Sequence, residues 1–132
     1  MTDLQQALNL PRAGDLDAAE AAYRALLADR PDDADALHLL GTLLHKRGHA
    51  VAAEESIRNA MMLDPECAQF HLSLGGVLMQ QGRDAEAHAA FERALELDPN
   101  APEAHALLGF VHARAGDMAA AEERFKSGRR AE

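Results

Sequence analysis

A period of 34 residues runs along this sequence and constrains its fold more than any other feature. The segment LDPECAQFHLSLGG at 63–76 returns 34 residues later as LDPNAPEAHALLGF at 97–110. A fixed interval of this size is typical of chains that stack one small unit several times, and 132 residues hold nearly four such units. Other residue types keep the same interval: glycine at 14, 48, 82 and 116 and at 41, 75 and 109, proline at 31, 65 and 99, and alanine at 19, 53, 87 and 121.

Each unit has the pattern of two amphipathic helices. In the third unit, the stretches AQFHLSLGGVLMQQG and RDAEAHAAFERALELDP both place apolar residues three or four positions apart. Gly82 is the last residue of the first stretch, just past the predicted helix, where a residue without a Cβ readily adopts the left-handed conformation that ends a helix. Pro99 is the last residue of the second stretch and lies just past the second predicted helix, which it cannot continue. The sequence therefore predicts an all-α fold of about eight helices.

These features resemble the tetratricopeptide repeat (TPR), in which Leu-Gly lies in the first helix and Ala-x-x-x-Phe, with a later Pro, in the second. The resemblance covers essentially the whole chain and implies a single repeat domain with the fold of a right-handed α-solenoid. It divides the chain into a degenerate first repeat at 1–33, full repeats at 34–67 and 68–101, and a truncated fourth repeat at 102–132. The matching residues are Leu40, Gly41, Ala53, Ile57 and Pro65, then Leu74, Gly75, Ala87, Phe91 and Pro99, then Leu108, Gly109, Ala121 and Phe125, with Ala19, Tyr23 and Pro31 in the first repeat.

Composition and charge exclude several classes of function. The 22 acidic residues outnumber the 13 basic ones, and the net charge of −9 repels nucleic acid and anionic membrane surfaces. No apolar run approaches the roughly 18 residues of a membrane span, and the N-terminus lacks the features of a signal peptide. The single cysteine, Cys67, cannot form an internal disulfide and has no obvious base beside it in the sequence. We therefore expect a cytoplasmic protein without nucleic-acid or membrane partners.

No motif in the sequence indicates catalysis. The glycines follow the repeat period and not the spacing of a phosphate-binding loop. His45 and His49 are four residues apart, but Gly48 ends the helix between them and nothing completes a set of metal ligands. His71 and His105 share one repeat position and are predicted to pack between neighbouring helices. We therefore expect no enzyme activity, no cofactor and no metal.

In proteins of the TPR family, the first helices of successive repeats line a concave groove that holds peptides, extended segments or helices of partner proteins. The resemblance implies which positions of each first helix face this groove. Its centre is apolar, at Leu72, Met79 and Phe110, and suits the apolar face of a helix or a short hydrophobic motif. The predicted groove residues are His38, Thr42, His45 and Lys46, then Gln69, Leu72, Gly76, Met79 and Gln80, then Glu103, Ala106, Phe110 and Arg114.

Two functions stay open at this point. The first is a non-catalytic scaffold that binds a peptide or helix of a partner protein in the groove. The second is an N-terminal recruitment or oligomerisation module of a longer enzyme such as a transferase, although Leu39, Ser73 and Leu107 stand where repeats of sugar-transferring enzymes carry a ladder of Asn. Weak self-association is also expected, because no preceding repeat covers Leu4, Leu8 and Leu10.

Overall fold

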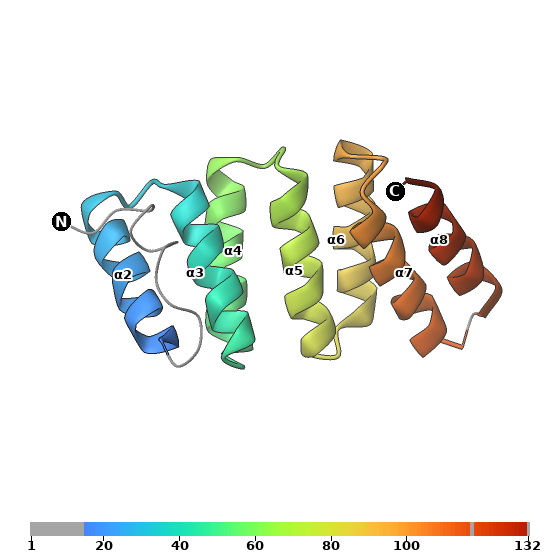
Figure 1. The fold of residues 1–132 in the computed structure, drawn as a ribbon, viewed down its shortest axis with the longest axis horizontal. Helices are drawn as coiled ribbons and strands as arrows, with labels where there is room; N and C mark the ends of the chain where they lie inside the picture. Colours follow the sequence, from blue (N-terminus) through green and yellow to red (C-terminus); the bar gives the residue numbers. More distant parts are fainter. Residues whose placement is uncertain (1–14, 117, 132) are drawn as a thin grey trace. The chain divides into compact units, whose positions relative to one another are not determined.

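The structure, a computed structural model, describes residues 15–116 and 118–131 (Figure 1). This part of the chain forms seven α-helices and contains no β-strand, which confirms the all-α fold class. The described residues fall into two compact units, one that ends at Pro65 and one that begins at Glu66. The expected opening helix with Leu4 and Leu8 lies outside the described residues.

Unit 1 contributes three of these helices, α2 (Leu16–Asp29), α3 (Ala34–Lys46) and α4 (Ala50–Leu63). The middle helix, α3, packs against both α2 and α4. At the start of α3, the side chain of Asp33 accepts a hydrogen bond from the backbone N–H of Ala36 at 3.0 Å. This bond satisfies one of the N–H groups that a helix leaves without a partner at its first turn.

Unit 2 contributes four helices, α5 (Ala68–Gln80), α6 (Asp84–Leu97), α7 (Pro102–Arg114) and α8 (Met118–Ala131). Helix α5 packs against α6, and α7 packs against α8. Helix α6 also contacts α7, and α5 touches α7. The pairs α5–α6 and α7–α8 each form one helix–turn–helix repeat, as the 34-residue period predicted.

A glycine fixes the turn between the two helices of a repeat. Gly48, Gly82 and Gly116 have φ angles of 84°, 75° and 84°. A side chain at such an angle would clash with the following carbonyl oxygen, so glycine is favoured. The role predicted for Gly82 is therefore confirmed, and it recurs in the repeats on either side.

A second row of glycines lets the two helices of a repeat approach closely. A Cβ atom on Gly41 would lie 2.5 Å from the side chain of Ile57, and one on Gly75 would lie 2.3 Å from the ring of Phe91. Ile57 and Phe91 are fully buried, and so is Ala87, one helical turn before Phe91. The glycine makes room for these core side chains, although at a helix position it is less favourable than Ala by about 1 kcal/mol.

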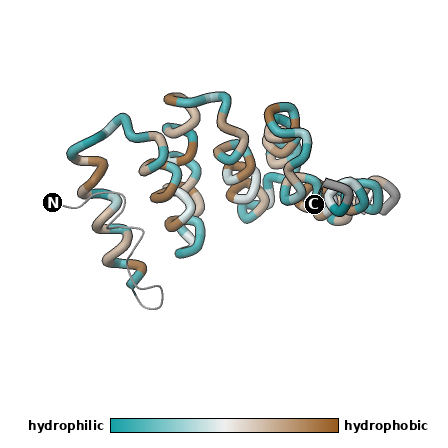
Figure 2. The backbone as a smooth tube through the Cα atoms, turned by 45° about the horizontal axis from the view of Figure 1, so that its top comes forward, coloured by the Kyte–Doolittle hydropathy of each residue, from teal (hydrophilic) through white to brown (hydrophobic). Residues whose placement is uncertain are grey.

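The helices of both units are amphipathic, apart from α7, whose apolar residues are spread more evenly around the helix. Figure 2 shows hydrophobic residues in brown and hydrophilic residues in teal alternating along the helices. The last helix is more polar than its counterparts, because Arg129 is exposed where Met61 and Leu95 are half-buried in the preceding repeats.

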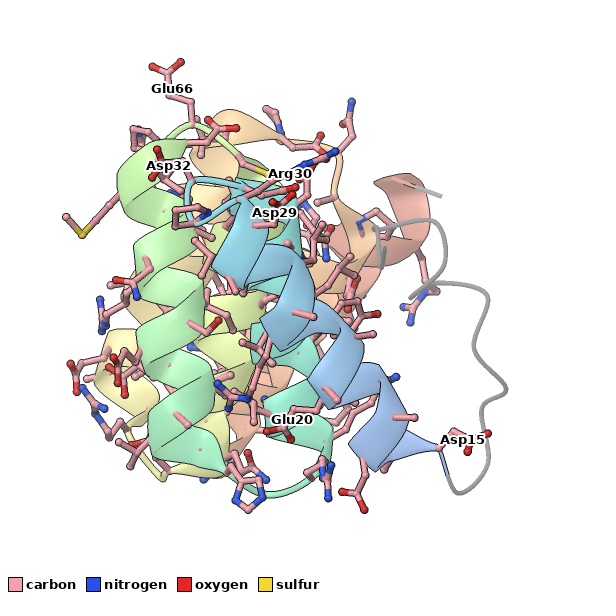
Figure 3. The ribbon with its side chains drawn as sticks, turned by 90° about the vertical axis from the view of Figure 1, so that its left-hand side faces the viewer. Asp15, Glu20, Asp29, Arg30, Asp32 and Glu66 are labelled. Carbon is pink, nitrogen blue, oxygen red and sulfur yellow. The ribbon has the colours of Figure 1, made fainter. Side chains whose placement is uncertain are left out.

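The turn between α2 and α3 is acidic. Figure 3 shows Asp29, Arg30 and Asp32 gathered at the C-terminal end of α2, while Glu20 lies nearer its other end. Asp35 is exposed in the first turn of α3. Negative side chains interact favourably with the positive end of the helix dipole, so this acidic turn favours the start of α3.

Candidate functional site

In unit 1, the predicted groove residues lie on α3. His38, Thr42 and His45 are half-buried, and Lys46 is exposed. The hydroxyl of Thr42 donates a hydrogen bond to the backbone carbonyl of Leu39 at 2.9 Å. Burial lowers the pKa of both histidines, and for His38 it outweighs the opposing effect of a nearby carboxylate. At neutral pH this part of the surface therefore carries neutral imidazoles and one exposed ammonium group.

In unit 2, the first set of predicted groove residues lies on α5. Gln69 and Gln80 are exposed, and Gly76 and Met79 are half-buried. Leu72 is only 6 % exposed, so the expectation that it forms part of an accessible apolar strip is wrong. Its apolar side chain is stabilised by removal from water, as for any core leucine. A substitution of Leu72 would test folding and not partner binding.

Phe110 on α7 is the exposed apolar side chain of this surface. It is 53 % exposed, whereas Ala106, one turn earlier, is half-buried. The ring of Phe110 meets the ring of Phe125 on α8 edge to face, with centroids 5.6 Å apart and planes at 79°. This arrangement is favourable for two aromatic rings and holds Phe110 in one orientation. The structure thus presents a fixed, half-exposed aromatic ring at a predicted groove position.

Two charged side chains lie on the same helix as Phe110. Glu103 is exposed near the start of α7, and Arg114 is exposed one turn after Phe110. The Nε atom of Arg114 lies 3.2 Å from Oδ2 of Asp84 on α6. Arg114 therefore links α7 to α6 and keeps a positive charge close to the exposed ring. We call the exposed side chains of α5 and α7 at predicted groove positions, namely Gln69, Gln80, Glu103, Phe110 and Arg114, the first-helix face of unit 2.

An arginine that sequence reasoning missed joins α3 to α2. Arg47 follows the last residue of α3 and forms ion pairs with Asp17 and with Glu20, the latter at 3.2 Å. Glu20 also pairs with Arg24 at 3.0 Å. The 34-residue period gave no signal for this cluster, because the residue that matches Arg47 in the next repeat is Gln81. Arg47 therefore has a structural role, whereas the neighbouring Lys46 is exposed.

A cleft of about 270 Å³ lies in unit 1 among α2, α3 and α4. Arg24 and Ser56 line it at positions that correspond to Glu92 and Arg124 in unit 2. In unit 2 those two residues form an ion pair at 2.7 Å that joins α6 to α8. Unit 1 cannot form this pair and keeps an open cleft instead. Leucines give the cleft its apolar part: Leu27, Leu37, Leu40 and Leu44.

The histidines do not gather into a metal centre in the described part of the chain. There, no group of three or more His, Cys, Asp or Glu side chains is placed to hold a metal ion. His105 is half-buried, and its Nε2 lies 3.1 Å from the carbonyl oxygen of Pro99. The rings of His88 and His112 meet edge to face, with centroids 5.4 Å apart. Within the residues described, moreover, no helix has the length and apolar character needed to cross a membrane.

The helical repeats, their glycine turns and their glycine–aromatic contacts define a tetratricopeptide repeat domain. The family profile described as the cytochrome c-type biogenesis protein H TPR domain matches residues 4–130. The chain belongs to this family of TPR domains. A comparison with curated proteins found no match.

Solved structures show the same fold. MamA from Desulfovibrio magneticus RS-1 is 24 % identical, with a TM-score of 0.87 over 96 % of this chain and 72 % of that chain. A second structure of MamA is 26 % identical, with a TM-score of 0.83 over 97 % of this chain and 74 % of that chain. A mutant O-GlcNAc transferase from Thermobaculum terrenum is 37 % identical, with a TM-score of 0.77 over 83 % of this chain and 21 % of that chain. The last similarity is confined to a small part of the transferase.

Proposed function

We propose that this chain is a non-catalytic scaffold that binds a segment of another protein through the exposed residues of its first helices. Phe110 carries this proposal. It is a large aromatic side chain, 53 % exposed, held by an edge-to-face contact with Phe125. Aromatic residues are frequent among the side chains that dominate protein–protein binding energy, because a rigid ring buries much apolar area at little entropic cost.

The surroundings of Phe110 favour a particular kind of partner. Glu103 and Arg114 place one negative and one positive charge on the same helix, and Gln69 and Gln80 on α5 add amide groups. Such a mixture favours a segment with an apolar anchor and polar flanks, such as the apolar face of a helix or a short hydrophobic motif. The apolar anchor should dominate the affinity, and the polar groups should set the orientation.

The proposal is tested in two steps. A photo-crosslinking amino acid at Glu103, which is exposed on α7, first captures and identifies the partner in cells. Calorimetry then compares the binding of that partner to the unaltered chain and to Phe110→Asp. We expect binding at least about tenfold weaker, or about 1.4 kcal/mol, with unchanged helical circular dichroism. Unchanged affinity for the captured partner would exclude the first-helix face of unit 2 as the binding surface.

A matched control separates this surface from the rest of the molecule. Val51 is 75 % exposed near the start of α4, outside the predicted groove. Val51→Asp makes the same chemical change as Phe110→Asp, from an exposed apolar side chain to a carboxylate. Partner binding should persist in Val51→Asp, because the altered residue does not belong to the first-helix face.

A second candidate function is recruitment within a longer enzyme. The observation that favours it is the 37 % identity to part of an O-GlcNAc transferase. Leu39, Ser73 and Leu107 nevertheless stand where the Asn ladder of such repeats is expected, so the mode of binding would differ. The reading frame around the coding sequence of these residues tests this candidate, since a fused catalytic domain would support it and its absence would exclude it.

We further propose a cytoplasmic location, because the single cysteine suits a reducing compartment. A fusion to a reporter enzyme that is active only after disulfide formation tests this point. Activity of the reporter would contradict the proposal.

A further inference from the structure

The outer side of α4 carries an exposed stripe of four side chains. Val51 and Met62 are 75 % and 82 % exposed, more than any other large apolar side chain in the described part of the chain. Glu55 and Arg58 lie between them and are exposed as well. Steps of four, three and four residues separate the four positions, so they share one face of the helix within an arc of about 60°. We call these four residues the α4 stripe.

The repeat architecture does not require this stripe. Singly exposed apolar residues are common on protein surfaces, but no other second helix has a large apolar residue at both ends of the corresponding face. The stripe is therefore a property of α4 itself. The corresponding positions hold Asp17, Ala21, Arg24 and Ala28 in α2, Ala85, Ala89, Glu92 and Glu96 in α6, and Ala119, Glu123, Lys126 and Arg130 in α8.

The order of residues in the α4 stripe is complementary to itself when reversed. The stripe begins and ends with an apolar side chain and has an acid followed by a base between them. The outer and the inner pair are both centred on the peptide bond between Ser56 and Ile57. A second α4 that runs antiparallel about this centre places each Val51 against Met62 of the second copy and each Glu55 against Arg58 of the second copy. We infer that the α4 stripe is a contact through which two copies of this chain pair.

Charge selects the antiparallel arrangement over the parallel one. In a parallel pair, Glu55 would face Glu55 and Arg58 would face Arg58, and like charges repel. The two-fold symmetry of the antiparallel pair gives two ion pairs and two apolar contacts from one surface. The Nε atom of Arg58 donates to Glu54 at 2.9 Å within α4. A guanidinium group has further N–H donors, so this bond orients the side chain and leaves donors for Glu55 of the second copy.

The cleft of unit 1 extends the apolar area beside the stripe. Glu55 of the stripe lines the cleft together with Ala52 and Asn59 of α4, and leucines of α2 and α3 form its apolar part. A second α4 laid on the stripe can therefore cover part of this cleft. In unit 2 the Glu92–Arg124 ion pair occupies the corresponding place, so the same extension is not present there.

The size of the contact indicates a weak and reversible dimer. Helix α4 has 14 residues and is about 21 Å long. One helix against another covers less than the roughly 1,200 Å² of a stable interface, so we expect a dissociation constant on the order of 0.1 to 1 mM.

Two single charge reversals and their mixture test the inference in the full chain. In Glu55→Arg the stripe carries two bases, and in Arg58→Glu it carries two acids. Sedimentation equilibrium at about 0.15 M salt, where the net charge is largely screened, should show self-association about tenfold weaker for each variant. The equimolar mixture should form a heterodimer at least as strong as the original homodimer, because every base then faces an acid. Met62→Ser should weaken self-association without any change in charge.

Charge-matched controls lie on α6, where Arg93 and Glu96 form an exposed pair with the same spacing. Arg93→Glu and Glu96→Arg change the net charge equally and should self-associate like the unaltered chain. A strict monomer at millimolar concentration would overturn the inference, and so would a mixture of the two stripe variants that does not associate. Dimers that persist in both stripe variants but vanish with Leu4→Asp would assign self-association to the N-terminal segment and overturn it as well.

Discussion

Replacement of Gly75 with Ala should destabilise the protein, although alanine is the better helix residue. The new Cβ atom would lie 2.3, 2.6 and 2.7 Å from three ring atoms of Phe91. These distances are shorter than any van der Waals contact, so the ring or the helix has to move. Phe91 is completely buried, and because protein cores are closely packed, a shift of its ring disturbs the side chains around it.

The expected magnitude follows from two opposing effects. Overpacking of a core by one carbon costs about 1–3 kcal/mol, and the overlap with three ring atoms favours the upper end. The higher helix propensity of alanine stabilises the folded state by about 1 kcal/mol relative to glycine. The net loss for Gly75→Ala should therefore be about 2 kcal/mol. In a Phe91→Ala background, which itself costs about 3–5 kcal/mol, the obstacle is gone and Gly75→Ala should stabilise by up to about 1 kcal/mol.

Urea unfolding of the four proteins in this double-mutant cycle measures the coupling, which should be about 3 kcal/mol. Phe91→Leu serves as a milder truncation where Phe91→Ala leaves too little folded protein. Gly82→Ala is the control, because its φ of 75° disfavours alanine while no atom lies within 4 Å of the added Cβ. It should cost about 1–2 kcal/mol in either background. An equal effect of Gly75→Ala in both backgrounds would refute the assignment of the close contact to Phe91.

Three further predictions concern other parts of the fold. Ala87→Leu, at a fully buried position of α6, should lower stability by about 1–3 kcal/mol in thermal or urea unfolding, and an unchanged midpoint would contradict the burial. Arg47→Ala removes the ion pairs to α2, including that with Glu20, and should cost at most about 1 kcal/mol, less at high salt, because these groups are partly exposed. The lowered pKa of His38 means that the unfolded chain binds its proton more readily, so this contribution to stability is complete above about pH 6.5 and is lost as the pH falls through the lowered pKa. His38→Gln should make the unfolding midpoint less sensitive to acid over this range, and an unchanged acid sensitivity would contradict the prediction.

Much of the fold could be predicted from the sequence, because the residues that end the helices and the residues that bring two helices together recur in successive repeats. Gly82 and Pro99 end helices for reasons that depend on the backbone alone, so their positions predict the turns. The pairing of Gly75 with Phe91 is also local, because both residues belong to one repeat. The period gave the fold class and the number of helices, apart from the opening helix, which lies outside the described residues.

The surface could be predicted less well, because the exposure of a side chain depends on which residues of neighbouring helices pack against it. Leu72 and Phe110 were both expected to be accessible, yet Leu72 is buried and Phe110 is half-exposed. The ion pair between Glu92 and Arg124 joins residues from different repeats, and no periodic signal marks it. The α4 stripe could not be predicted from the sequence alone, because it depends on the exposure of all four of its side chains. The reversed order of these residues is nevertheless present in the sequence.

The pattern of helix contacts also has a kinetic consequence. Within each unit, the contacting helices are neighbours along the chain or, for α5 with α7 and α6 with α8, next-but-one neighbours. Every contact therefore closes a short stretch of chain, and the entropy lost in closing a loop grows with its length. Chains dominated by such near-neighbour contacts form their structure quickly, and ordering can begin at any helix pair and spread to the next. Each helix pair can thus fold as it leaves the ribosome, while later repeats are still being synthesised.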